Sequence, residues 1–179
     1  MDRQPELTGE LLALRPAARE DFDALFAVAR DPLIWEIHPA HDRWRAPVFQ
    51  RFFDDGLASG GMLVARDRAT DMVVGSSRYD FARAERGEVE IGWTFLARSH
   101  WGGRYNAEMK ALMLDHAFRS VDRVLFMVGE ANIRSRRAVE KIGGYLTQRQ
   151  HLAEMAGRSI NHVVYAIDRP AQADSDMVS

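Results

Sequence analysis

A predicted turn between a strand and a helix is the segment of this sequence best suited to hold a phosphate group. Residues 97–108 read A-R-S-H-W-G-G-R-Y-N-A-E, with two adjacent glycines just before the helix. Glycines let the backbone approach a ligand closely, and the first amides of a helix carry partial positive charge. Arg98, His100 and Arg104 add cationic side chains. The turn matches neither the dinucleotide fingerprint nor the P-loop, so alone it is equally well explained as a glycine turn with solvated arginines.

A second segment opens another predicted helix. Residues 132–145 read N-I-R-S-R-R-A-V-E-K-I-G-G-Y. Asn132 is a good N-cap, and Ser135 at the third helical position can share in satisfying the amides that begin the helix. Capping is therefore the simplest explanation of both residues, and it is compatible with a role in a site.

Seven strands and four helices must position these segments. Short apolar or alternating runs predict strands over residues 11–16, 62–67, 72–81, 88–97, 124–129, 145–151 and 160–168. Apolar residues at helical spacing predict helices over residues 18–30, 47–59, 106–120 and 132–142. The order of these elements predicts a mixed α/β (α+β) layer fold with antiparallel strands in the middle of the chain.

Composition limits the classes of protein to consider. The chain has 179 residues, 46% of them hydrophobic, and a net charge of -2. We expect one domain over residues 10–169, an N-terminal lead-in over 1–9 and a flexible tail over 170–179. Near-neutral charge argues against a nucleic-acid binder, and the lack of a long apolar run or basic leader indicates a soluble cytoplasmic protein without membrane contact.

Residue types exclude further chemistry. The chain has no cysteine, which removes thiol nucleophiles, redox pairs and Cys-ligated metal centres. The six histidines show no metal-binding spacing, so we expect no metal.

Taken together, these motifs resemble the GNAT superfamily of N-acetyltransferases, and more narrowly its branch that acetylates ribosomal-protein N-termini. That branch carries W-G-x-G-Y-A/N-x-E, then N-x-x-S, then E-K-x-G. Here these motifs stand at residues 101–108, at Asn132 and Ser135, and at residues 140–143. The resemblance spans residues 12–168 and implies a twisted, mostly antiparallel sheet of about seven strands flanked by about four helices.

The resemblance also implies acetyl-coenzyme A as cosubstrate and names the residues that would hold it. The turn would wrap the pyrophosphate, the end of the preceding strand would pair with the pantetheine arm, Asn132 would lie near the sulfur, and Arg137 would reach the 3′-phosphate. The strand and turn residues are Thr94, Phe95, Leu96, Ala97, Arg98, Gly102, Gly103, Arg104, Tyr105 and Asn106. Two positions depart from the pattern: Arg104 replaces a glycine, and Val139 stands where many members place a tyrosine thought to protonate the leaving thiolate.

Acetyl transfer to an amine needs a base, because only the free amine attacks a thioester. At pH 7 roughly a tenth of an α-amino group is free, and far less of a lysine. Glu90, on the strand that leads to the turn, is the carboxylate best placed to take the proton, although it also suits an exposed strand position. In the resembling branch a helix serine is proposed to protonate the thiolate, which makes Ser135 the candidate. Without a cysteine, we expect direct transfer in a ternary complex.

The acceptor is a primary amine, either a protein N-terminus or a small molecule, and the resemblance places its pocket beside the loop over residues 31–46. Candidate pocket residues are Trp35, His38, Tyr79 and Trp93, of which Tyr79 and Trp93 also suit plain packing. The alternative function is a catalytically inactive acyl-coenzyme A-binding sensor or partner module, which the two departures leave open. The sequence permits a monomer or a homodimer.

Overall fold

One eight-stranded sheet organises the chain, which the computed structural model describes over residues 1–171. The strands are β1 (Leu7–Thr8), β2 (Leu12–Pro16), β3 (Met62–Asp67), β4 (Val73–Asp80), β5 (Glu88–Leu96), β6 (Arg123–Gly129), β7 (Tyr145–Met155) and β8 (Arg158–Asp168). The helices are α1 (Phe22–Ala29), α2 (Ala46–Ala58), α3 (Arg104–Ala117) and α4 (Ile133–Lys141). The predicted mixed α/β fold with a mostly antiparallel sheet is confirmed, and the strand beyond the expected seven is the two-residue β1.

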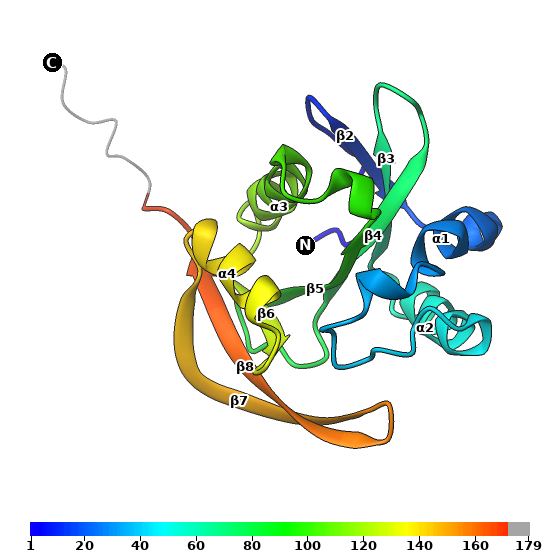
Figure 1. The fold of residues 1–179 in the computed structure, drawn as a ribbon. Helices are drawn as coiled ribbons and strands as arrows, with labels where there is room; N and C mark the ends of the chain where they lie inside the picture. Colours follow the sequence, from blue (N-terminus) through cyan, green and yellow to red (C-terminus); the bar gives the residue numbers. More distant parts are fainter. Residues whose placement is uncertain (172–179) are drawn as a thin grey trace, which may run out of the picture.

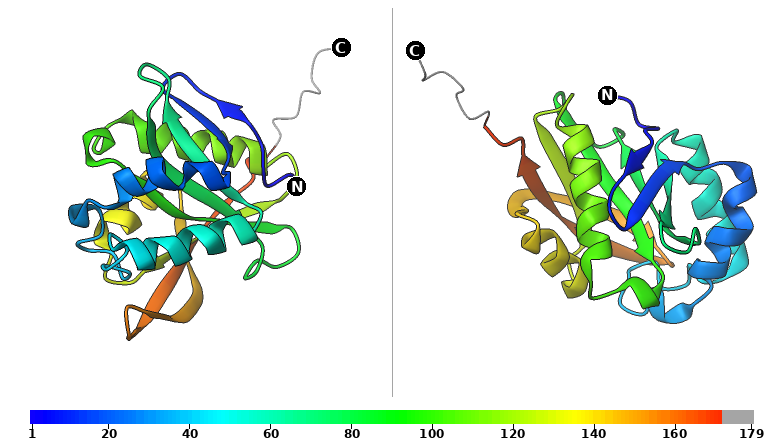
Figure 2. Two further views of the ribbon diagram at one scale, coloured as in Figure 1. Left: turned by 90° about the vertical axis from the view of Figure 1, so that its right-hand side faces the viewer. Right: turned by 90° about the horizontal axis from the view of Figure 1, so that it is seen from above.

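The helices cover both faces of the sheet, α3 and α4 on one side and α1 and α2 on the other (Figure 1). Met109, Met113 and Val139 pack from α3 and α4 into one core. Leu25 and Phe49 belong to the second core, which α1 and α2 close from the opposite face. Figure 2 shows the same layers from two other directions, with the β7–β8 hairpin extending beyond them. Apolar residues on both faces explain why the central strands are nearly continuously buried.

The element boundaries differ from the predicted ones by local causes. The helix expected from residue 18 begins at Phe22, because Asp21 turns back to accept hydrogen bonds from the backbone N of Ala18 at 2.8 Å and from Arg15. The strand expected to end at residue 151 continues to Met155, and the hairpin turns at Ala156 and Gly157, both with positive φ. The predicted lead-in contributes β1, whereas residues 172–179 of the predicted tail lie outside the described part of the chain.

β5 and β6 are the only neighbours in the described sheet that run parallel, and they stay together for just three residue pairs. Pairing runs from Glu88 opposite Arg123 to Glu90 opposite Leu125. Beyond that point β5 pairs with β4 and β6 pairs with β8. The two strands therefore part in the middle of the sheet and leave one backbone edge of each unpaired.

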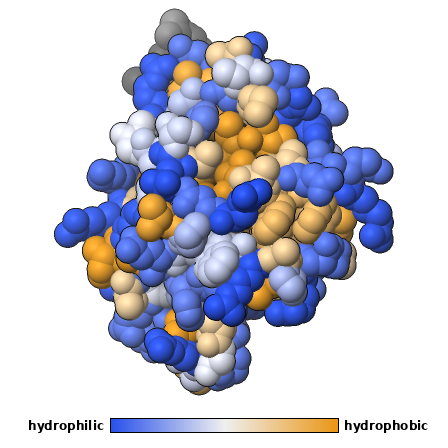
Figure 3. Space-filling model, turned by 45° about the vertical axis from the view of Figure 1, so that its right-hand side comes forward, coloured by the Kyte–Doolittle hydropathy of each residue, from blue (hydrophilic) through white to orange (hydrophobic). Residues whose placement is uncertain are grey.

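The surface mixes apolar and charged areas. On the face drawn in Figure 3, hydrophobic side chains gather in one area that hydrophilic side chains surround. Within residues 1–171, no helix has both the length and the apolar character needed to cross a bilayer.

Candidate active site

The opening between β5 and β6 begins at an irregularity in β5. Arg78 of β4 lies opposite Gly92 and Ser76 lies opposite Phe95, so one extra residue of β5 is accommodated between these pairs. Trp93 lies in this bulge with φ 52°, a conformation that a bulky side chain adopts only when its surroundings impose it. Strained backbone of this kind is concentrated at functional sites. The bulge turns the free edge of β5 toward the opening.

Glu90 lies at the point where β5 and β6 part. Its side chain is 2% exposed and accepts hydrogen bonds from Arg83 Nη2 at 2.7 Å and Nε at 3.1 Å. Burial raises the pKa of Glu90 to about 7, while the charge and hydrogen bonds of Arg83 oppose that rise. A carboxyl group that titrates near neutral pH is suited to accept a proton from an ammonium group. The alternative of an exposed strand carboxylate is wrong.

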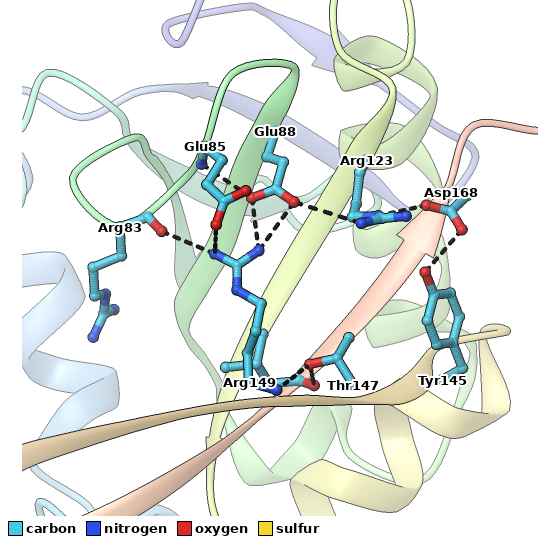
Figure 4. Close-up of polar contacts among 9 residues, drawn as sticks. Arg83, Glu85, Glu88, Arg123, Tyr145, Thr147, Arg149 and Asp168 are labelled. Carbon is cyan, nitrogen blue, oxygen red and sulfur yellow. Dashed lines mark hydrogen bonds and ion pairs between the residues drawn. The ribbon is translucent and has the colours of Figure 1, made fainter.

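Arg149 fixes the turn that carries Arg83 (Figure 4). It reaches from β7 to Glu88, with Nη1 at 3.0 and 2.9 Å from the two carboxylate oxygens. Its Nη2 donates to the carbonyl oxygen of Arg83 at 3.4 Å and lies 3.8 Å from a carboxylate oxygen of Glu85. Through Arg83, the position of Glu90 therefore depends on the β7–β8 hairpin as well as on β5.

The glycine turn has the geometry expected of an anion site. Gly102 has φ +69°, and a Cβ built on Gly102 or Gly103 would meet no atom within 4 Å. α3 begins at Arg104, and neither a capping side chain nor an acidic residue in its first turn occupies its first amides. Arg104 is the first helical residue and has no positive φ, which explains how an arginine replaces glycine there.

Two carboxylates, the buried Asp67 and the half-buried Glu108, hold this turn in place. Asp67 of β3 accepts hydrogen bonds from Tyr105 at 2.8 Å and pairs with His100 at 3.1 Å, and the Tyr105 hydrogen bond contributes most to holding the pKa of Asp67 well below its usual range. Glu108 accepts from the backbone N of Leu11 and Leu12 at 2.8 Å each, which joins α3 to the start of β2. The side chains of Tyr105 and Glu108 thus anchor the turn, and backbone amides remain for a ligand.

The end of β5 likewise offers backbone rather than side chains. Phe95 and Leu96 are buried in the two cores. The Thr94 hydroxyl is occupied by Lys110 Nζ at 2.6 Å and Ser77 Oγ at 2.8 Å. Ala97 caps a short turn over residues 98–100. These residues can pair with a ligand only through the free edge of β5.

Asn132 and Ser135 lie where β6 meets α4. Asn132 is 3% exposed, and its Oδ1 accepts from the backbone N of Ser135 at 3.2 Å, which confirms the predicted N-cap. The Ser135 hydroxyl has no hydrogen-bond partner within residues 1–171. Among the nearby cations, Arg98 pairs with Asp31, while Arg137 is exposed.

A cavity of about 520 Å³ lies beside β5, lined by Trp93 together with residues of β4, α2 and the tip of the β7–β8 hairpin. The three other residues expected in the acceptor pocket, Trp35, His38 and Tyr79, do not line it. Trp35 is buried with its Nε1 donating to Ala29, and the Tyr79 hydroxyl donates to Met113 across the other core. Both side chains are buried in the core, and the predicted pocket roles stay predictions. His38 packs against the Trp35 ring, and burial lowers its pKa well below 6.5.

Four cationic residues near the site were not predicted. Arg83 binds Glu90, Lys110 binds Thr94, and Arg43 and Arg78 line the cavity. Arg78 lies on β4 two residues before Asp80, and Asp80 pairs with Glu90. This alternation is the one sequence signal that could have placed Arg78 near Glu90. Nothing in the local sequence marks the others as buried.

Comparison with known proteins agrees with this geometry. Residues 12–144 match the family model described as "Acetyltransferase (GNAT) domain". "Uncharacterized N-acetyltransferase p20" from Bacillus licheniformis is 29% identical over 120 residues, or 63% of this chain and 66% of that protein. The chain thus covers slightly less than two thirds of this curated relative.

Solved structures share the fold. A GCN5-related N-acetyltransferase from Brucella melitensis superposes with a TM-score of 0.79 at 19% identity, covering 93% of this chain and 79% of that one. Spermidine N-acetyltransferase from Vibrio cholerae, solved with CoA and spermine, superposes with a TM-score of 0.68 at 15% identity, covering 90% and 97%.

Proposed function

The chain belongs to the GNAT acetyltransferase family, and from this premise we propose that it moves an acetyl group from acetyl-coenzyme A to a primary amine by direct transfer. The observation that carries the proposal is the buried carboxyl group of Glu90 at the point where β5 and β6 part. A titratable group there lies beside the free edge of β5, on which a thioester would be held. The acceptor amine belongs to a protein N-terminus or to a small molecule.

The described residues fit coenzyme A. Open space at Gly102 and Gly103, next to the free amides that begin α3, suits a pyrophosphate. The unpaired edge of β5 suits the amide groups of a pantetheine arm, since these can form strand-like hydrogen bonds. Arg98 and Arg137 would offer charge to the phosphates. When bound, the thioester supplies an activated acetyl group.

Glu90 acts as the general base in this proposal. Arg83 occupies one lone pair on each carboxylate oxygen, so the carboxylate keeps acceptor capacity for an ammonium proton or a bridging water. Removing that proton leaves the amine lone pair free to attack. Backbone N–H groups on the free edge of β5 then stabilise the oxyanion of the tetrahedral intermediate.

Ser135 passes a proton to the leaving thiolate and regains one from solvent water. Its hydroxyl lies in the first turn of α4, where the helix amides lower the free energy of a nearby anion. Val139, at the position of the tyrosine found in many relatives, is buried in the core and cannot take this role.

The test is thiol release by the purified protein with acetyl-coenzyme A and a panel of amines. We expect turnover by the wild type and its loss in Glu90→Gln with acetyl-coenzyme A binding, measured by calorimetry, unchanged. Tight binding without turnover of any amine would instead identify an inactive acyl-coenzyme A-binding module.

A further inference from the structure

Two buried arginines face the cavity beside β5. Arg43, from the loop before α2, is 9% exposed, and Arg78, from β4, is 7% exposed. Within residues 1–171 no carboxylate lies within 4.0 Å of the Arg43 guanidinium, which rests instead 4.4 Å from the ring centre of Phe52 and 5.1 Å from that of Trp35. Arg78 stacks on the Trp93 ring, its one carboxylate partner within 4.0 Å among residues 1–171 is Asp80 at 3.8 Å, and its buried Nε donates no hydrogen bond.

Burying two arginines without a close carboxylate destabilises the protein unless another interaction compensates for it. Burial and the neighbouring charge of Arg78 lower the pKa of Arg43 to about 10, so both side chains remain charged at neutral pH. A buried charge without a close partner destabilises a protein, and two adjacent like charges add repulsion. An anion between them would satisfy both guanidinium groups, which bind carboxylates well through parallel N–H donors.

The acidic residues of the cavity do not supply this partner. Asp42 is half-buried, and Asp55 and Glu154 are exposed. The deep part of the cavity is therefore cationic and its rim is mixed. A polyamine would have to place positive charge against the two buried arginines, which the cavity disfavours.

The arginines also lie at a useful distance from the proposed base. Arg78 is directly opposite Gly92, so Glu90 is its diagonal neighbour on the same face of the sheet, at roughly 7–8 Å between backbone positions. The Trp93 ring lies 3.6 Å from the Arg78 guanidinium and 5.3 Å from that of Arg83, which binds Glu90. Glu90 itself does not line the cavity, so a short molecule bound on the arginines would extend past the Trp93 ring to place its amine near Glu90.

We propose that the acceptor amine carries a carboxylate and that Arg43 and Arg78 bind this carboxylate in the cavity. The proposal rests on the acetyltransferase function and specifies its substrate class. The carboxylate belongs either to a free amino acid or to an acidic residue near the N-terminus of a peptide.

Matched acceptors test the proposal. Each pair differs only in the carboxylate: an amino acid against its carboxamide, and a peptide beginning with Asp-Gly against one beginning with Asn-Gly. We expect a higher kcat/KM per free amine for the carboxylated member of at least one pair, which also identifies the source. Arg43→Gln or Arg78→Gln should lower that value tenfold or more by raising KM, as expected for a lost charged hydrogen bond, and should leave the uncharged member nearly unchanged.

Arg119→Gln is the matched control, because Arg119 is exposed, follows α3 and does not line the cavity. This variant should leave kcat/KM unchanged for both members of each pair. Three results would overturn the proposal. The first is equal turnover of both members of each pair, and the second is preference for the uncharged member or for a polyamine. The third is an equal loss of turnover with both members in the variants. If Arg78→Gln does not fold, Arg43→Gln carries the test alone.

Binding separates this proposal from the acetyltransferase function. Calorimetry with glutarate, a dicarboxylate without an amine, should show binding to the wild type and its loss in Arg43→Gln, whether or not any amine is acetylated. Turnover of amines without glutarate binding or carboxylate preference would refute the carboxylate site alone. Glutarate binding without turnover would refute the acetyltransferase function alone.

Discussion

Replacing Glu90 with glutamine gives the sharpest prediction about proton transfer. With a pKa of about 7, roughly one-eleventh of Glu90 is ionised at pH 6 and roughly ten-elevenths at pH 8. The wild-type kcat/KM should therefore rise about tenfold across this interval beyond any rise from the amine itself. Glu90→Gln should lower the rate at pH 8 by about 10²- to 10⁴-fold and remove this limb of the profile.

The assay is thiol release at a fixed saturating concentration of acetyl-coenzyme A, from pH 5.5 to pH 9 with one amine. Dividing the wild-type profile by that of Glu90→Gln cancels the titration of the amine, so the ratio reports Glu90. Arg83→Gln is the diagnostic partner variant. Because the charge and hydrogen bonds of Arg83 lower the pKa of Glu90, their removal should move the inflection above pH 7. A pH-independent ratio, or an inflection that moves down in Arg83→Gln, would refute the reasoning.

The same group makes a prediction about stability. Burial raises the pKa of Glu90 from 4.5 to about 7, so the native state holds this proton more tightly than the unfolded state does. This proton therefore stabilises the native state at low pH. The stabilisation is lost as the pH rises from about 4.5 to about 7, and the free energy of unfolding falls by up to about 3 kcal/mol. Urea unfolding should show the wild type losing stability relative to Glu90→Gln between pH 5 and pH 8. An unchanged difference would mean that Glu90 is not buried as described.

Three other substitutions test separate parts of the site. Ser135→Ala should lower kcat and leave acetyl-coenzyme A affinity unchanged in calorimetry, because only the backbone N of Ser135 bonds to Asn132; an unaffected kcat would assign the proton to water. Gly102→Ala should cost about 1–2 kcal/mol in thermal unfolding because of its positive φ, and it should weaken acetyl-coenzyme A binding; full affinity would place the pyrophosphate elsewhere. Lys110→Met should gain stability over the wild type as the pH falls from about 10 toward 7, because burial lowers the pKa of Lys110 to about 7 and the unfolded state binds the proton first; a constant difference would refute this.

Much of the fold could be predicted because the deciding signals are local. β3 was predicted residue for residue, and α4 and the last hairpin within a few residues, since apolar spacing and glycine stops mark them. β1 is only two residues long and forms by pairing with β2, which no local pattern reveals. The late start of α1, at Phe22, depends on the hydrogen bond between Asp21 and Arg15 of β2, which is a contact between two elements.

The site was predictable where a motif or an alternation fixed it. Glu90 and the Gly102 turn lie where their spacing placed them. Trp35 is expected in a pocket beside the loop over residues 31–46, yet that loop folds back and buries the ring against Phe95. The alternation along β4 points Tyr79 to the face of the sheet that α3 covers. The sequence alone does not show which face α3 covers.

Arg43 and Arg78 show most clearly what could not be predicted from the sequence. Charged residues are rarely buried without a partner, so sequence patterns assign Arg43 and Arg78 to the surface. Only the meeting of the loop before α2 with β4 brings both to one cavity.

The most direct test of acetyl transfer is to quantify both products of one reaction. Purified protein, acetyl-coenzyme A and an amine are incubated, and free thiol and acetylated amine are measured over time, the latter by mass spectrometry. Direct transfer predicts that both rise together, one for one, through many turnovers, and that both form about 10²- to 10⁴-fold more slowly in Glu90→Gln. Thiol release without an acetylated amine across the whole panel, or equal product from Glu90→Gln, would contradict the account.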